Sequence, residues 1–420
     1  MTATPEGAAS DTRSLAWLAE VENIVPAGCS TLAKTPHRLL PGRGAIAAAH
    51  AKDAEFTDVD GRTWLDCEMA MGTVTWGHRR PEVEEAVIAQ LRRGTSFSVA
   101  DPLELALAQR LLARLGVFES VKFAKSGADA VSGAVRMARA ATGRDLVVAT
   151  EYHGWHDWAA SAHYAQSPGE LGIPRAVAAL TLACGPGDIE RVVDLVRGSQ
   201  GLPAAVVLCP NRWSAGDLRT IAEEARSRGV VVVFDEVTCG MRMGPRGACG
   251  EADVWPDLLC ISKGMANGLP LAAVLGDRHL VMRAAEVRMS NAHSSESLAF
   301  AAALACEDLL EQAPQWPSWR ARATTMMADW RARIAEPGLV GRVEVRGDYS
   351  SFSLGTPGAS DFWTDPVRSH LMTALADQQI FTKGYFVFSD RHTPAQLDDV
   401  ERAVVAALAT YRQYDGTEHC

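Results

Sequence analysis

The sequence has no long apolar run, no paired cysteines and no excess of positive charge. No hydrophobic stretch approaches the roughly 18 residues that a membrane-spanning helix needs. The nine cysteines are scattered singly, without a CxxC pair, which favours reduced thiols over disulfides or a zinc site. The formal net charge is −10. We therefore expect no nucleic-acid partner, no membrane partner and no bound metal.

The N-terminal residues also lack the basic-then-apolar pattern of a secretion signal. Together with the unpaired cysteines, this predicts a cytoplasmic protein. The chain has 420 residues, of which 22% are charged and 47% apolar. These values are ordinary for a globular protein with a sizeable core, and the length favours two domains.

Predicted strands and helices alternate through the middle of the chain. We expect strands at residues 121–124, 146–149, 204–208, 230–234, 258–261 and 271–275. Such alternation predicts a mostly parallel sheet with helices on both faces. After about residue 290 the pattern changes to long helices with strands predicted over 343–352 and 381–388. This change predicts a smaller α+β domain.

Two buried strands end in residues that can carry chemistry. The apolar run 230–234 is followed by Asp235, and the run 258–261 is followed by Lys263. Open α/β sheets bind their ligands at the carboxyl ends of their strands. The pair is therefore either a cofactor site or a buried ion pair, and these two residues alone do not separate the possibilities.

Each of the two residues has a functional and a structural interpretation. A desolvated lysine is a nucleophilic amine, as Schiff-base chemistry requires, although Lys263 could also be a solvated lysine beside a turn. A carboxylate such as Asp235 can keep a pyridinium nitrogen protonated, although it could also be an ion-pair or metal-ligand acid. The sequence contains no convincing metal cluster, because His153 and His156 lie in one loop motif.

Two further segments favour the cofactor interpretation. Residues 125–128 join a strand to a helix, so their backbone N–H groups can bind a phosphate. They match neither GxxxxGK[ST] nor GxGxxG, which argues against a nucleotide enzyme. The alternative is a plain turn. Residues 152–156 follow a strand, and Tyr152 could stack on a cofactor ring or be a core aromatic.

Together these segments resemble the class III aminotransferases, which have fold-type I and use pyridoxal phosphate. Within this family, the chain is similar to the branch that contains glutamate-semialdehyde aminomutase, over about residues 20 to 410. The matching motifs are Ser126-Gly127-Ala128-Asp129-Ala130, Tyr152-His153-Gly154, Asp235-Glu236-Val237 with Gly240 and Arg242, and Pro256-Asp257 followed by Lys263, Gly268 and Pro270.

The resemblance implies a role for each matching residue. Lys263 would form the Schiff base with pyridoxal 5'-phosphate and carry the proton, and Asp235 would hold the ring nitrogen. Tyr152 and Val237 would lie on opposite faces of the ring. The remaining cofactor-binding residues would be Ser126, Gly127, Ala128, His153, Asn211 and Ser294. Because Lys263 and Asp235 would act at opposite edges of the ring, we expect them not to touch.

The resemblance also implies a domain plan and an oligomeric state. Residues 1–67 would form an N-terminal lid that contributes to the small domain, residues 68–290 the large cofactor domain, and residues 291–420 the connecting helices and C-terminal α+β domain. The chain would form a homodimer with active sites at the interface.

Two positions depart from the family. Ala128 stands where a threonine is frequent, and Ala292 stands where a partner-donated threonine is expected, so Ser294 or Ser295 could substitute.

The predicted activity is transfer of an amino group between an amino donor and a small carbonyl compound. Arg38, Trp76 and Arg391 are the candidate substrate residues. An intramolecular aminomutase, hence an isomerase, is the second hypothesis, and a racemase or epimerase is the third. A catalytically dead binding protein is a further alternative, but it predicts loss of the lysine or the acid, and both are present.

Overall fold

The computed structural model describes residues 12–163, 172–312, 316–359 and 362–412. The chain divides into two compact units. Unit 1 comprises Met1–Arg80 and Pro317–Cys420, and unit 2 comprises Pro81–Trp316. These boundaries differ from the expected ones at residues 67 and 290, because helix α13 (Ser297–Gln312) packs against α3 (Pro81–Arg93) and α4 (Pro102–Leu115). No described helix is both long and apolar enough to cross a membrane.

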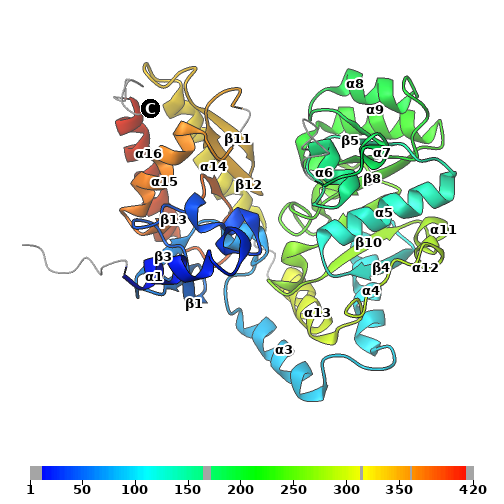
Figure 1. The fold of residues 1–420 in the computed structure, drawn as a ribbon, viewed down its shortest axis with the longest axis horizontal. Coiled ribbons are helices and arrows are strands. Elements are labelled where there is room, and N and C mark those ends of the chain that lie inside the picture. Colours follow the sequence, from blue (N-terminus) through cyan, green and yellow to red (C-terminus); the bar gives the residue numbers. More distant parts are fainter. Residues whose placement is uncertain (1–11, 164–171, 313–315, 360–361, 413–420) are drawn as a thin grey trace, which may run out of the picture. The chain divides into compact units, whose positions relative to one another are not determined.

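Unit 2 is built on a seven-stranded sheet with the order β4-β10-β9-β8-β7-β5-β6 (Figure 1). The strands are β4 (Ser120–Ala124), β5 (Val147–Ala149), β6 (Thr181–Ala183), β7 (Ala205–Leu208), β8 (Val231–Asp235), β9 (Leu258–Ile261) and β10 (Ala272–Gly276). Strand β10 runs antiparallel to both β4 and β9, and the pairings among β9, β8, β7, β5 and β6 are parallel. The predicted mostly parallel sheet is confirmed.

The sheet is buried on both faces. Alternate strand residues, including Val207, Val233 and Cys260, form one core cluster with the inner face of α5 (Gly127–Thr142). The intervening residues, such as Val232 and Phe234, are also fully buried. Parallel strands that are covered on both sides have continuous apolar sequences. For this reason the sequence predicts β7, β8 and β9 to within one residue.

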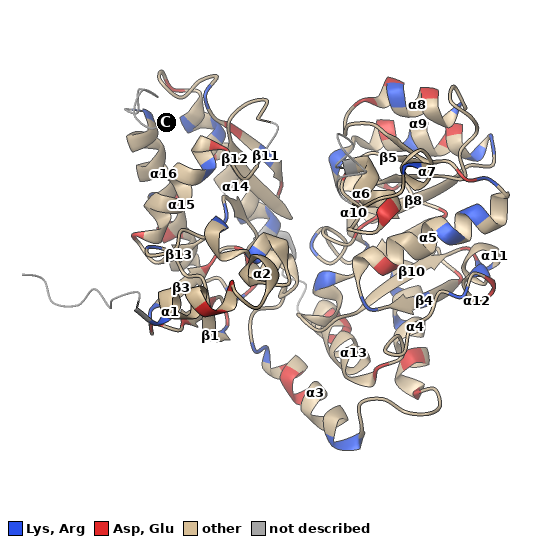
Figure 2. Ribbon diagram, viewed as in Figure 1, with Lys and Arg blue, Asp and Glu red and all other residues tan. Residues whose placement is uncertain are grey.

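The helices of unit 2 connect these strands and cover the sheet. Besides α3, α4, α5 and α13 they are α6 (Asp157–His163), α7 (Arg175–Ala178), α8 (Ile189–Val196), α9 (Ala215–Arg226), α10 (Gly247–Ala252), α11 (Arg278–Val281) and α12 (Arg283–Glu286), with short 3-10 turns η4 (Pro210–Arg212) and η5 (Lys263–Ala266). In α3 the acidic residues lie in the first turn and the basic ones in the last (Figure 2), which complements the helix dipole.

Unit 1 contains two small sheets with the orders β1-β2-β3-β13 and β11-β12-β14. Its strands are β1 (Ala48–Lys52), β2 (Glu55–Asp58), β3 (Thr63–Asp66), β11 (Glu344–Asp348), β12 (Ser351–Gly355), β13 (Ile380–Phe381) and β14 (Tyr385–Phe386). Its helices are α1 (Thr12–Val21), α2 (Met69–Gly72), α14 (Trp316–Ile334), α15 (Pro366–Ala376) and α16 (Pro394–Arg412), with 3-10 turns η1 (Pro26–Gly28), η2 (Leu32–Lys34) and η3 (Pro36–Arg38).

Two strand predictions in unit 1 were wrong in extent. Residues 343–352 form a hairpin rather than one strand, because the chain reverses between Asp348 and Ser351 and β11 pairs with β12. Residues 381–388 contain two short strands separated by Gly384, which has a φ of +90°. An alternating pattern by itself does not show where the chain reverses, so it misses both turns.

Candidate active site

The two residues that end neighbouring strands lie in unit 2. Asp235 is the last residue of β8, where it is paired in register with Cys260 of β9. Lys263 follows β9 and begins the turn η5. Because β8 and β9 are parallel, both side chains leave the sheet at its carboxyl edge, where open α/β sheets bind ligands.

The Asp235 carboxylate is buried and fixed by two donors. Its Oδ1 accepts the backbone N–H of Val237 at 3.0 Å, and its Oδ2 lies 2.9 Å from His153 Nδ1. The His153 ring is itself buried and stacks parallel to Trp158 at a centroid distance of 6.4 Å. The histidine therefore fixes the direction in which the carboxylate points.

Lys263 is held in an unusual conformation. Its φ is +48°, a left-handed backbone that costs a residue with a side chain of order 1–3 kcal/mol and is typical of functional sites. Its Nζ donates a hydrogen bond of 2.8 Å to Thr238 Oγ1. Burial lowers the pKa of Lys263, and the charge of Asp235 partly opposes this effect. A lowered pKa increases the share of neutral, nucleophilic amine.

No ion pair joins Lys263 to Asp235 in the described part of the chain, since each has separate partners. The expectation that the two side chains do not touch is confirmed. The arrangement is therefore not a simple buried ion pair. The amine and the acid can serve two different atoms of one ligand.

The first turn of α5 carries two backbone donors without a protein partner. Ser126 and Asp129 form a capping box in which Ser126 Oγ accepts the Asp129 N–H at 3.1 Å and Asp129 Oδ2 accepts the Ser126 N–H at 3.1 Å. The N–H groups of Gly127 and Ala128 have no acceptor among the described residues. Such free donors at a helix N-terminus bind phosphate readily.

Tight packing brings the separate motifs together. A Cβ placed on Gly127 would lie 2.5 Å from Val237 Cγ1, and one placed on Gly154 would lie 2.7 Å from the Cβ of Ala128. Only glycine permits these approaches. The turn before α5, the loop after β5 and the loop after β8 therefore meet at one place in unit 2.

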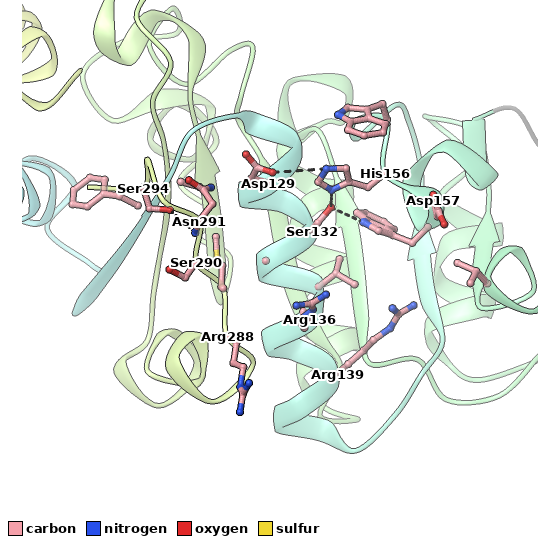
Figure 3. Close-up of a pocket in the computed structure, with 18 residues that line it drawn as sticks. Asp129, Ser132, Arg136, Arg139, His156, Asp157, Arg288, Ser290, Asn291 and Ser294 are labelled. Carbon is pink, nitrogen blue, oxygen red and sulfur yellow. Dashed lines mark hydrogen bonds and ion pairs between the residues drawn. The ribbon is translucent and has the colours of Figure 1, made fainter. Parts of the chain in front are cut away.

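Three other predicted site residues also lie in unit 2. Tyr152 is 48% exposed. Asn211 lies in η4, directly after β7. Ser294 belongs to a turn in which its Oγ accepts the Asn291 N–H at 3.2 Å, and it lines the same cavity as Asp129 (Figure 3). Their roles toward a cofactor stay predictions.

The structure adds residues that the sequence did not single out. Cys209 offers its sulfur within 4.8 Å of ligand atoms of His153 and Asp235, and burial raises the pKa of its thiol well above the usual range. Glu151 accepts the Cys209 N–H at 3.1 Å, and burial raises the pKa of its carboxyl. No linear motif marks this group, because its members come from the carboxyl ends of three different strands.

The His153–Cys209–Asp235 group has the donor types of a transition-metal site. One feature favours another use. The carboxylate already forms a hydrogen bond to the imidazole. A buried, oriented carboxylate is the group that a pyridine nitrogen requires.

The candidate substrate residues all belong to unit 1. Arg38 lies over the Trp363 ring at 4.3 Å and donates to Leu32 O. Trp76 is buried. Arg391 forms an ion pair of 3.0 Å with Asp53. Because these residues and Lys263 belong to different units, their contact with substrate stays a prediction.

The sequence matches the aminotransferase class III family over residues 42–194 and 204–404. Because this match covers most of the chain, the protein belongs to that family. The predicted family and fold class are thereby confirmed, and so is pyridoxal 5'-phosphate as the cofactor of this class.

Individual relatives include both transaminases and aminomutases. A 2'-deamino-2'-hydroxyneamine transaminase of Streptomyces kanamyceticus is 36% identical over 61% of this chain, and the match spans 64% of that relative's length. A glutamate-1-semialdehyde 2,1-aminomutase of Thermomicrobium roseum is 32% identical over 77% of this chain and 79% of its own.

Solved structures share the fold across nearly the whole chain. The FumI protein of Sphingopyxis, in its PLP internal aldimine form, superposes with a TM-score of 0.86 at 22% identity and covers 97% of this chain and 98% of its own. A transaminase with PLP bound gives 0.83 at 24% identity, with 96% and 98% covered. The described residues fit such a cofactor, since they offer a buried acid, a lysine and free N–H donors.

Proposed function

We propose that the protein is a pyridoxal-phosphate-dependent aminotransferase that moves an amino group between an amino donor and a small carbonyl compound. The observation that carries the proposal is the arrangement of Lys263 and Asp235. They lie at the ends of adjacent parallel strands and have separate partners, in the same unit as the first turn of α5 with the N–H groups of Gly127 and Ala128.

Each residue has a distinct task in this proposal. The Lys263 amine attaches the cofactor covalently, and its Nζ later carries a proton at the amino-bearing carbon of the substrate. Thr238 orients that amine through the 2.8 Å hydrogen bond. When bound, the cofactor supplies an electron sink for the electrons released from that carbon.

The other residues bind and orient. Asp235, aligned by His153, holds the ring nitrogen in its protonated form. Gly127 and Ala128 donate N–H groups to the phosphate, beside the Ser126 cap, and Ser294 completes the phosphate site. Tyr152 would cover one ring face and Val237 the other, and Asn211 would lie near the ring oxygen. Arg38 and Arg391 recognise an anionic group of the substrate, and Trp76 lines its pocket.

A homodimer with active sites at the subunit interface is part of the proposal. The substrates are small molecules, an amino donor and a carbonyl acceptor. The intramolecular aminomutase is the second candidate, supported by the relatives of that name. Both reactions use the same lysine and acid, and a racemase or epimerase would use them as well.

A donor screen tests the proposal. The purified holoenzyme is mixed with amino donors, and the absorbance of the cofactor is followed together with the released product. A transaminase converts its cofactor to the pyridoxamine form and releases a keto or aldehyde product. Formation of a positional isomer without net amine exchange would instead identify the mutase, and no spectral change with any amine would contradict both.

A further inference from the structure

A chain of polar contacts runs along one wall of a cavity beside α5. The cavity holds about 480 Å³ and lies between α5, residues 155–158 and the loop 288–294 (Figure 3). Trp158 Nε1 donates to Ser132 Oγ at 2.9 Å, and Ser132 Oγ lies 2.6 Å from His156 Nδ1. His156 Nε2 lies 3.8 Å from Asp129 Oδ1.

All donors in this series of polar contacts point from Trp158 toward Asp129. An indole N–H can only donate, so the Ser132 oxygen accepts from Trp158. Among its described contacts, the Ser132 hydroxyl hydrogen then has one acceptor, His156 Nδ1. A neutral imidazole that accepts at Nδ1 carries its hydrogen at Nε2. That nitrogen lies 3.8 Å from Asp129 Oδ1, within ion-pair range but too far for a hydrogen bond.

Asp129 connects this series of polar contacts to the first turn of α5. Its second oxygen, Oδ2, accepts the Ser126 N–H at 3.1 Å and the Ser126 hydroxyl at 2.8 Å. Asp129 follows directly after Gly127 and Ala128, whose N–H groups are free. A carboxylate so close to a bound phosphate would repel it unless its charge is partly compensated.

We propose that His156 is a positioning residue for the cofactor phosphate. It fixes the Asp129 carboxylate and draws its charge away from the phosphate, and Asp129 in turn fixes the Ser126 cap. This inference rests on the proposed phosphate-binding role of Gly127 and Ala128. It assigns Ser132 and Trp158 the supporting task of orienting the imidazole.

A matched pair of substitutions distinguishes the roles of the two ring nitrogens of His156. In His156→Asn the amide can replace Nδ1 and keep the Ser132 contact, but it does not reach Asp129. In His156→Gln the amide nitrogen can replace Nε2 and keep the donor toward Asp129. We expect the dissociation constant of pyridoxal phosphate from the apoenzyme to rise about tenfold in His156→Asn, because the Asp129 carboxylate loses a polar neighbour that offsets its charge. It should change less than about threefold in His156→Gln.

The Asp129→Asn background tests whether the effect passes through the carboxylate. With no charge at residue 129, adding His156→Asn should change the dissociation constant by less than about twofold. The phosphorus NMR signal of the bound phosphate should shift in His156→Asn and stay near the wild-type position in His156→Gln. His279→Asn is the control, because His279 is exposed on α11 and has no described side-chain contact.

Each outcome decides the proposal. Equal affinity of His156→Asn and wild type would overturn it, as would an equal loss in both His156 variants that persists with Asp129→Asn. If the His156 variants fold poorly, Ser132→Ala, which is favourable in a helix, should weaken binding in the same direction, and unchanged binding would overturn the proposal. Wild-type protein that does not bind pyridoxal phosphate would instead overturn the proposed function itself.

Discussion

At the scale of single residues, Lys263 and Asp235 differ in how the protein holds them. Lys263 has a left-handed backbone and one hydrogen bond through Nζ, to Thr238. Asp235 is buried and accepts from both His153 and the Val237 N–H. The lysine is thus free to leave its partner, whereas the acid is fixed. This difference matches an amine that reacts and a carboxylate that only orients.

The lowered pKa of Lys263 predicts a pH effect on the stability of the apoenzyme. Burial lowers the folded-state pKa below the ordinary value of 10.5, so the unfolded chain binds more protons than the folded one between the two pKa values. Stability therefore rises with pH in that window. We expect wild type to gain stability relative to Lys263→Met between pH 7.5 and pH 10. Urea denaturation of both apoenzymes at each pH measures this gain, and a constant difference would contradict it.

Replacing Asp235 with Asn should separate cofactor binding from chemistry. The amide keeps the shape of the side chain but no longer stabilises a protonated ring nitrogen. We expect the cofactor to bind within about tenfold of wild type, while the donor half-reaction slows about 100-fold or more, the scale of one lost electrostatic contact at a reacting centre. Stopped-flow absorbance measures the rate. A normal rate would exclude Asp235 as the ring-nitrogen partner.

At the scale of elements, the first turn of α5 depends on a glycine in close contact with Val237. Gly127→Ala should destabilise this turn, because its Cβ would lie 2.5 Å from Val237 Cγ1. Overpacking of this kind costs about 1–3 kcal/mol, despite the better helix propensity of alanine. Thermal unfolding and a cofactor titration should both show a loss.

Gly216→Ala is the matched control for this substitution. Gly216 is also in the first turn of a helix, α9, and a Cβ there would meet Ser214 Oγ at 3.6 Å, an ordinary contact. We expect this variant to be neutral or stabilised by a few tenths of a kcal/mol up to about 1 kcal/mol. An equal effect of the two substitutions would show that the Val237 contact has no energetic role.

The strands also show how much of the fold and of the candidate site could be predicted from the sequence. Strands β8 and β9 could be predicted because a strand buried on both faces is a continuous apolar run. Strand β6 is only half-buried and gives no such signal. The His153–Asp235 contact joins residues 82 positions apart, so no local pattern encodes it. The family resemblance identified the motifs that contain His153 and Asp235. Only the fold shows that His153 orients the Asp235 carboxylate.

At the scale of the whole molecule, each unit has its own core and its own buried polar group. In unit 1, Lys383 forms an ion pair with Glu68, and Tyr385 donates to the same carboxylate oxygen. Burial raises the pKa of Glu68 and lowers that of Lys383. Both shifts reflect the cost of burying charge, which the pairing offsets.

Removing one member of this pair should destabilise unit 1. Lys383→Met leaves the Glu68 carboxylate buried without a cation, which costs about 3–5 kcal/mol. Adding Glu68→Gln removes the stranded charge and keeps an acceptor for Tyr385, so the double variant should recover most of the loss. Urea denaturation of the two variants measures both effects. A double variant no more stable than Lys383→Met would contradict this explanation.

Borohydride reduction is the most direct test of whether Lys263 holds the cofactor covalently. The holoenzyme is reduced, digested and mapped by mass spectrometry, with Lys263→Ala and Lys383→Met, which lacks another buried lysine, in parallel. We expect a phosphopyridoxyl group on Lys263 in wild type and Lys383→Met, and none in Lys263→Ala. A reduced cofactor on another lysine, or no modification in wild type, would contradict it.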